Sequence, residues 1–232
     1  MVITHLMKTS RIAIHCALRA PLFLFLLQAP LAITEILQEA LGINNSVQPP
    51  LWAVFIVLPT FFVLSFLSSA LTLAAVFHLH TTGRCSWNNL WAMIRPKIRP
   101  LLIASIALGS LAGLGLVAYI IPGLLLMTLF LFVPHVITLD PPTSLWAYVT
   151  RSKRLVSRHP FVSFFIVVFS FGLSALLFLL GEHFGTYYGV AGSTDFGRLS
   201  ILIATRSLFS MFGALIIDVW VAAFFLYLRN LE

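Results

Sequence analysis

An aspartate inside the last apolar run of the chain has the side chain most suited to chemistry. Asp218 lies in the sequence IIDVW, near the centre of the stretch 207–228. A charged group at the centre of a membrane-spanning helix costs about 2.5–3.5 kcal/mol on insertion scales. We therefore expect Asp218 to be neutral, paired or facing a polar cavity. In a cavity it can relay a proton or a cation, or contact a ligand; the alternative is a protonated carboxyl that is hydrogen-bonded inside the helix bundle.

Hydroxyl side chains in two other apolar runs are the candidate partners of Asp218. Neither run carries a cation within the span, so a buried ion pair is not expected. The candidates are Ser65, Ser68, Ser69 and Thr72 in one run, and Ser105 and Ser110 in the other.

Three more polar residues, Gln28, Glu35 and Glu39, lie in the first apolar run, 20–41. Glu35 and Glu39 are four residues apart, so they share one face of a helix near its outer end. Together with Gln28 they could form an outer gate for a cation or a substrate. The interpretation that we favour is that both carboxylates reach the outer membrane interface.

No set of residues in the sequence has the pattern of a catalytic or metal site. His78 and His80 are two apart, on different faces of a helix, and no third ligand has suitable spacing. His135 is alone in its run, and the chain has no phosphate-binding loop or dinucleotide fingerprint. We expect no metal, no cofactor and no enzymatic activity.

Two segments between apolar runs share the tripeptide Leu-Trp-Ala and are amphipathic as helices. Pro96 is expected to break the first helix late, and Thr143 or Ser144 can cap the second. Helices of this kind lie in the membrane interface, with tryptophan among the lipid headgroups. The predicted apolar faces are Trp87, Leu90, Trp91, Ile94 and Ile98 in the first segment, and Leu145, Trp146, Val149 and Val156 in the second.

The same two segments carry basic residues that point to a negatively charged partner. Basic side chains on an interfacial helix are typical of contact with lipid phosphate. We expect binding to anionic membrane lipids or to a partner protein through Arg95, Lys97, Arg99, Arg151, Lys153, Arg154 and Arg158.

The elements that hold these residues follow from the composition. The chain has 232 residues, of which 60% are hydrophobic and 9% are charged, and its mean hydropathy is +1.02. Soluble domains carry about 25% charged residues, so a soluble enzyme and a disordered tail are both excluded. The formal net charge is +7, but no segment is long and polar enough to be a nucleic-acid-binding domain. The predicted fold is an all-α, polytopic integral membrane protein.

Six transmembrane helices are predicted from apolar runs of about 20 residues, the length that crosses a bilayer. The stretch 100–139 carries no charge over 40 residues and is twice the length of one span, so it is expected to fold back as a hairpin at 119–123. A re-entrant arrangement is the alternative there. Residues 182–206 are expected to form a Gly-rich outer loop. The predicted spans are 20–41, 51–77, 100–118, 122–139, 161–181 and 207–228.

Charge placement predicts how these helices are oriented. Twelve of the 14 Lys and Arg fall in segments that are cytoplasmic if both termini are, and only Arg198 and Arg206 fall outside. This bias follows the positive-inside rule. We expect a multi-pass protein of a bacterial inner membrane with both termini in the cytoplasm, and free thiols at Cys16 and Cys85.

Two kinds of repetition are present in the chain. The basic segments, with a weaker version at 6–19, suggest three hairpin repeats, each preceded by an amphipathic interfacial helix. The alternative is that any inner loop of a multispan protein is basic and aromatic. Gly109 and Gly113 have the spacing of a close helix-packing face, for which Ser65 and Ser69 are a candidate counterpart.

The stretch 83–157 resembles the YciC-like integral membrane proteins, which are related to membrane domains fused to some bacterial glycerophosphodiester phosphodiesterases. The resemblance lies in Gly83-Arg84, Ser86-Trp87, Ile121-Pro122-Gly123, Pro134, Ala147 and Arg151-Ser152-x-x-Leu155. The family's glycine after that leucine is replaced here by Ser157, Arg158 and His159. The resemblance implies a six-helix bacterial inner-membrane protein of undefined role, and it supplies no catalytic residues.

Two functions are consistent with these observations. The first is a non-enzymatic accessory or organising module that contacts anionic lipid or partner proteins through its basic helices. The second is a small transporter or channel for a solute or lipid that uses Asp218. The second predicts that Asp218 faces a cavity between helices, whereas the first predicts a dry core. The sequence does not identify a substrate, a protein partner or an oligomeric state.

Overall fold

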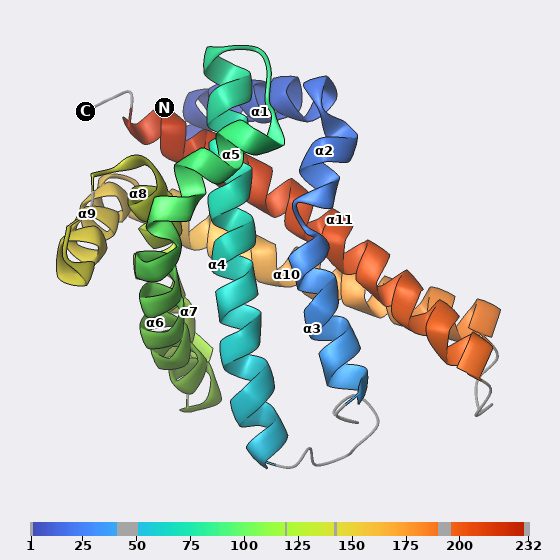
Figure 1. Ribbon diagram of the computed structural model, residues 1–232. Coiled ribbons are helices and arrows are strands. Elements are labelled where there is room, and N and C mark those ends of the chain that lie inside the picture. The colour runs from blue at the N-terminus through green and yellow to red at the C-terminus, as the bar shows by residue number, and fades with distance from the viewer. Residues whose placement is uncertain (1, 41–50, 119, 142, 190–195, 230–232) are drawn as a thin grey trace.

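The computed structural model describes residues 2–40, 51–118, 120–141, 143–189 and 196–229, and these residues form helices with no strand among them. The apolar runs and the amphipathic segments each become helical, as expected for an all-α membrane protein (Figure 1). The helices are α1 (Val2–Arg19), α2 (Pro21–Leu26), α3 (Ala29–Ala40), α4 (Leu51–Thr81), α5 (Trp87–Ile94), the 3₁₀ turn η1 (Arg95–Lys97), α6 (Ile98–Ala118), α7 (Ile120–Phe130), α8 (Val133–Leu139), α9 (Leu145–Arg158), α10 (Pro160–Gly189) and α11 (Phe196–Arg229).

Four helical segments among the described residues are long and apolar enough to cross a membrane. They are Pro59–Thr81, Ile121–Leu139, Pro160–Gly181 and Ile203–Arg229. A bent pair, Met7–Arg19 with Pro21–Thr34, would make a fifth span if it crosses as one. A membrane-embedded, multi-pass chain is therefore supported, while the count of six spans remains a prediction.

Helices that follow one another in the chain pack as antiparallel pairs. In Figure 1, α6 lies beside α7 and α10 beside α11, and α3 packs against α4. A helix precedes each pair: α1 before the first, α5 before the second and α9 before the third. The order of elements is compatible with three hairpin units, and the repeat itself remains a prediction.

Two predicted turns differ from the structure. Residues 120–123 belong to α7, with Pro122 in its first turn, where a missing N–H costs no helical hydrogen bond. Helix α6 ends at Ala118 and α7 begins at Ile120, and the residue between them lies outside the described residues. The predicted outer loop 182–206 is also wrong, because α10 continues to Gly189 and α11 begins at Phe196. Packing of α10 against α11 outweighs the weak helix propensity of the glycines.

The first predicted span is broken near its middle. Pro21 starts α2 after a 96° bend from α1, and a turn at Leu27 and Gln28 separates α2 from α3. The bend lays α1 across the ends of α4 and α11, where the Trp220 indole donates a hydrogen bond to the Ser10 hydroxyl at 3.4 Å. The Arg19 guanidinium donates to the Leu79 carbonyl at 3.2 Å, which is a favourable position for a cation at a helix C-terminus.

The two predicted interfacial helices form and are capped by serine. The Ser86 and Ser144 hydroxyls accept hydrogen bonds from the N–H of Asn89 at 3.4 Å and of Ala147 at 3.3 Å. As predicted, Pro96 interrupts the first helix, which tightens into η1.

The apolar faces of these helices only partly match the prediction. In α5, Leu90 and Ile94 are buried, while Trp87 and Trp91 are exposed. In α9, the buried residues are Tyr148, Ser152, Leu155 and Val156, while Trp146 of the predicted apolar face is exposed. A tyrosine and a serine take inner positions because their hydroxyls find backbone partners there.

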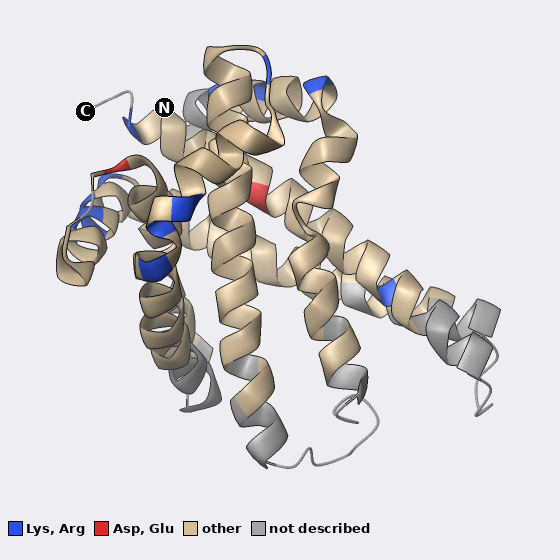
Figure 2. Cartoon of the chain, viewed as in Figure 1, with Lys and Arg blue, Asp and Glu red and all other residues tan. Residues whose placement is uncertain are grey.

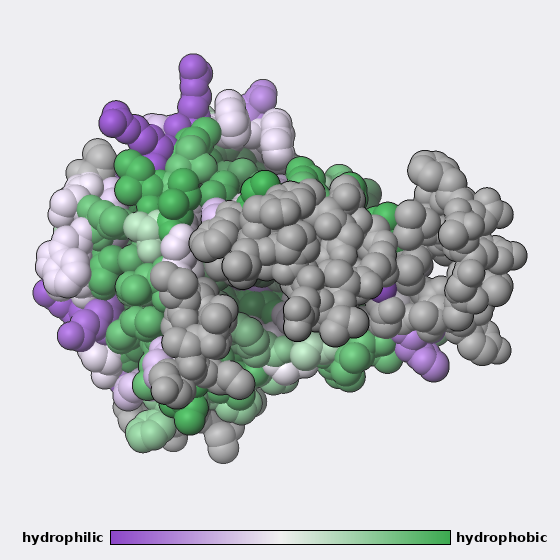
Figure 3. Space-filling model, turned by 90° about the horizontal axis from the view of Figure 1, so that it is seen from below, coloured by the Kyte–Doolittle hydropathy of each residue, from purple (hydrophilic) through white to green (hydrophobic). Residues whose placement is uncertain are grey.

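The surface has the character of a protein surrounded by lipid. Seen from below, the visible side chains are mostly hydrophobic, with hydrophilic groups near the edges (Figure 3). Many large apolar side chains are exposed along α6 and α10, including Ile103, Ile106, Phe165 and Leu179. Figure 2 shows most Lys and Arg gathered toward the end of the molecule that carries α1, α5 and α9.

Candidate functional site

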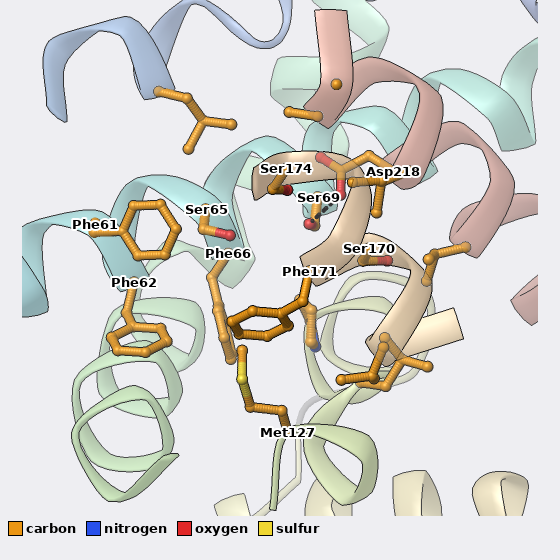
Figure 4. Close-up of a pocket in the computed structure, with 18 of the residues that line it drawn as sticks. Phe61, Phe62, Ser65, Phe66, Ser69, Met127, Ser170, Phe171, Ser174 and Asp218 are labelled. Carbon is orange, nitrogen blue, oxygen red and sulfur yellow. Dashed lines mark hydrogen bonds between the residues drawn. The ribbon is translucent and has the colours of Figure 1, made fainter. Parts of the chain in front are cut away.

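An intramembrane cavity of about 560 Å³ lies among the packed helices, and Asp218 is in its wall. Helices α4, α6, α7, α8, α10 and α11 contribute most of the lining, with Leu31 from α3. Figure 4 shows phenyl rings and Met127 on one side and hydroxyl groups with the aspartate on the other. The volume falls in the range of pockets that hold small ligands. The labelled lining residues are Phe61, Phe62, Ser65, Phe66, Ser69, Met127, Ser170, Phe171, Ser174 and Asp218.

One face of α11 forms a long wall of the cavity. Its lining residues recur at intervals of three and four, the spacing of a single helical face. Ser210 and Ala214 bring small side chains to the middle of this wall, and Leu177 of α10 packs closely against Gly213. The lining residues of α11 are Arg206, Phe209, Ser210, Gly213, Ala214, Ile217, Asp218 and Val221.

Serines on α4 and α10 supply most of the other polar groups in the wall. Ser65 and Ser69 are one turn apart on α4, and Ser170 and Ser174 are one turn apart on α10. The Ser170 hydroxyl donates to the Ile166 carbonyl of its own helix at 2.6 Å. The wall is therefore apolar in bulk, with a few hydroxyls and a single described carboxyl.

The predicted partnership of Asp218 with the serines of α4 is present. The Ser69 hydroxyl donates a hydrogen bond to Asp218 Oδ1 at 2.9 Å, as the dashed line in Figure 4 marks. Gln28 and Ser68 also interact with this carboxyl. By contrast, the Ser105 hydroxyl bonds the Leu102 carbonyl of its own helix at 2.9 Å, so α6 does not supply that partner.

Gln28 lies at the break between α2 and α3 and is completely buried. Its Nε2 donates to Thr72 Oγ1 at 3.0 Å, and its Oε1 accepts a hydrogen bond from the Ser68 hydroxyl. The same hydroxyl is 3.1 Å from the Leu27 carbonyl oxygen. The sequence offered Gln28, with Glu35 and Glu39, as part of an outer gate, which was the less favoured of the two interpretations. The structure instead places it in the polar cluster beside Asp218, while the side chains of Glu35 and Glu39 lie outside the described residues.

Two more ionisable side chains line the same cavity. Arg206, a predicted outer residue, is 12 residues from Asp218 on α11, or about 18 Å along the helix. His135 of α8 is buried against the rings of Phe132 and Phe225, at centroid distances of 6.1 and 5.4 Å. Within the described residues, no three His, Cys, Asp or Glu side chains come together as metal ligands.

A second charged site, which the sequence analysis missed, surrounds Asp140 at the start of the α8–α9 loop. This carboxylate is buried and pairs with Arg151 at 2.7 Å and with Arg229 at 3.6 Å. The Lys97 ammonium donates to the Asp140 backbone carbonyl. A signal for this site was present in the sequence, because Asp140 is the one acid among the basic residues of the two predicted inner loops.

The basic residues predicted to bind lipid therefore divide into two groups. Arg151 and Lys97 are engaged by Asp140 and tie α9 and η1 to the C-terminal end of α11. The other five, Arg95, Arg99, Lys153, Arg154 and Arg158, are exposed.

The short motifs that carry the family resemblance have structural positions here. The Ser152 hydroxyl donates to the Leu129 carbonyl at 2.8 Å, and Leu155 is buried in the core. Gly83 has a φ of +72°, a left-handed conformation that favours glycine after a helix. Pro122 and Gly123 are in the first turn of α7. Comparisons of the chain with protein-family models, curated proteins and solved structures return no match.

Proposed function

We propose that this chain is a membrane-embedded binding and transport protein for an amphiphile, a molecule with an apolar body and a cationic or hydrogen-bond-donating end. The observation that carries the proposal is the cavity of about 560 Å³ with Asp218 in its wall. Phenyl rings and Met127 suit an acyl chain or an aromatic body. The carboxyl of Asp218 suits an ammonium group, since charge-assisted hydrogen bonds are the strong ones.

The charge pattern of the wall favours a positive group at Asp218. Arg206 lies about 18 Å away along α11, too far to neutralise this carboxyl by direct contact. It also has interactions of its own within the protein. A ligand that enters the middle of the cavity therefore meets Asp218 and hydroxyls rather than a cation.

The first test is cavity filling with a matched surface control. Ala214→Phe places a ring in the middle of the α11 wall, whereas Ala175→Phe adds the same ring to an exposed position of α10. We expect Ala214→Phe to lower the affinity for the bound amphiphile by about tenfold, or about 1.4 kcal/mol of binding free energy, because the ring occupies space that the ligand needs. The measurement is lipid and small-molecule analysis of protein purified in native-membrane discs. Equal ligand content in the two variants would contradict the proposal.

Removal of the charge tests recognition at Asp218. Asp218→Asn keeps the shape of the side chain, so a cationic amphiphile should lose about 10- to 100-fold in affinity while an uncharged analogue loses little. Flux of the same molecules in proteoliposomes then separates binding from transport. Equal losses for charged and uncharged analogues would argue against a role in charge recognition.

A second function, an accessory module on anionic lipid, is favoured by the exposed side of α9. Trp146 is 77% exposed and Lys153, Arg154 and Arg158 are also exposed, a combination typical of an interfacial helix. Arg151 is left out of the test because it pairs with Asp140. Reversing Lys153, Arg154 and Arg158 to Glu should abolish binding to anionic liposomes without unfolding the protein; unchanged binding would exclude this second function.

A further inference from the structure

The break in the first span lies beside Asp218 and gathers oxygen atoms. Leu27 and Gln28 interrupt the helix, and Ser68 contacts both the Leu27 carbonyl and Gln28 Oε1. The hydroxyl of the next residue of α4, Ser69, donates a hydrogen bond to the Asp218 carboxyl group. Carboxylate, amide, hydroxyl and carbonyl oxygens from three segments of chain therefore converge at one place in the bundle. A break between two helical segments beside an acid is an arrangement in which membrane transporters hold sodium ions or protons.

The charge balance at this place is incomplete. Among the described residues, no basic side chain forms an ion pair with Asp218. The ion pairs in this part of the chain are those of Arg151 and Arg229 with Asp140. A carboxylate held in a span without a counter-charge is costly, so a positive charge has to come from elsewhere.

The ionisable groups on the neighbouring elements do not supply that charge. His135 and Arg206 share the cavity wall, the latter about 18 Å away along α11. Lys8, Arg11, His15 and Arg19 of α1 and His183 of α10 are exposed. His78 and His80 lie near the end of α4, nine or more residues beyond Ser69.

We propose that Asp218 holds one exchangeable monovalent cation, a proton or a sodium ion, which an amphiphile entering the cavity displaces. Displacement by an amphiphile rests on the proposed function. Exchange of the cation at Asp218 does not depend on that function. A proton on Oδ2 leaves Oδ1 to accept from Ser69, so the hydrogen bonds seen in the structure persist. A sodium ion would instead use the oxygens of Asp218, Ser69, Ser68, Gln28 and the Leu27 carbonyl.

Displacement by a ligand would couple binding of the amphiphile to release of the small cation through the charge of Asp218. A cationic amphiphile and the small cation compete for one carboxylate, so binding of one releases the other. The expected signature is release of one proton or one sodium ion per cationic molecule bound.

The experiment uses the full chain in lipid nanodiscs and dicyclohexylcarbodiimide, which modifies protonated carboxyls in apolar surroundings. Peptide mass spectrometry separates labelling at Asp218 from labelling at Asp140, whose carboxylate is held by arginines. We expect Asp218 to be labelled at acidic pH, with the rate falling about tenfold per pH unit above its titration midpoint.

Carbodiimide labelling in sodium chloride and in choline chloride distinguishes the two cations. If the cation is sodium, sodium chloride protects Asp218 where choline chloride does not, and Ser68→Ala weakens that protection. Ser65→Ala is the matched control, since Ser65 lines the cavity one turn before Ser69. If the cation is a proton, sodium and choline give equal rates at every pH.

Infrared difference spectra of wild type minus Asp218→Asn provide a readout that needs no reagent access. A carboxylic-acid band that is unchanged across pH and between the two salts, together with pH-independent labelling, would overturn the inference. An exchange that is normal but insensitive to amphiphile and to Ala214→Phe would instead contradict the proposed function alone.

Discussion

At the scale of single residues, two acids among the described residues lie in polar surroundings inside the protein, and they behave differently. Asp140 is paired with arginines at the end of the helices, whereas Asp218 is bonded to a serine hydroxyl and opens onto a cavity. Arg151 and Arg229 compensate the buried charge of the Asp140 carboxylate, so Asp140 is assigned a structural role. Asp218, which lacks such a partner among the described residues, is the one assigned to ligand chemistry.

Arg151 and Arg154 provide a matched test of that structural role. Arg151 pairs with the buried Asp140 carboxylate, while the Arg154 side chain is exposed three residues later. Arg151→Gln leaves Asp140 with the more distant Arg229, so it should destabilise the protein by more than the about 0.5 kcal/mol of an exposed pair and less than the about 3–5 kcal/mol of a fully buried one. Arg154→Gln should leave the melting temperature unchanged. Thermal unfolding in detergent measures both; equal melting temperatures would show that the pair contributes no stability.

At the scale of elements, close approach between α4 and α6 depends on one glycine. The predicted small-residue face of α6 does pack against α4. At Gly109 it contacts the ring of Phe62 rather than the predicted Ser65 and Ser69. A Cβ added at Gly109 would lie 2.4 Å from Phe62 Cγ. Gly172 on α10 has nothing within 4 Å of the same added atom.

The two glycines therefore predict opposite effects of the same substitution. Gly172→Ala should be neutral or stabilising, because alanine is favoured over glycine in helices by about 1 kcal/mol. Gly109→Ala should destabilise by about 1–3 kcal/mol because Phe62 has to move, and it should also disturb the cavity that both residues line. Melting temperatures of the two variants in detergent test this; a stable Gly109→Ala would mean that Phe62 has an alternative rotamer at little cost.

At the scale of the whole molecule, the distribution of charge predicts orientation. Cys85 lies between α4 and α5, at the basic end of the protein, and Cys16 is buried. Burial raises the pKa of the Cys85 thiol, so less of it is thiolate at neutral pH. Its reaction with maleimide should be slower than that of a free thiol and should accelerate as the pH rises through the raised pKa.

Labelling of Cys85 from each side of the membrane tests the orientation. In a Cys16→Ala background, an impermeant maleimide should label Cys85 in inverted vesicles and not in intact spheroplasts. Ser193→Cys, in a Cys85→Ala version of that background, is the opposite control because residue 193 belongs to the predicted outer segment. The reverse pattern would invert the predicted topology.

The sequence alone was sufficient for the class of protein and for the helical character of its apolar and amphipathic segments. Hydrophobic runs and charge placement are local properties, and a bilayer requires that backbone hydrogen bonds be satisfied within each helix. Asp218 and its serine partners on the second span also followed from local reasoning, since a carboxyl in an apolar run has few possible partners.

Only the tertiary structure decided which polar residues meet and where empty space remains. The Asp140 site, the burial of Gln28 beside Asp218 and the cavity all depend on contacts between residues far apart in the chain. The bend after Arg19, the break at Gln28 and the extension of α10 to Gly189 and of α11 back to Phe196 are set by packing, which outweighs local propensity. Hydrophobic runs in the sequence indicate where helices form. A binding site depends instead on how helix faces of similar composition are turned toward one another.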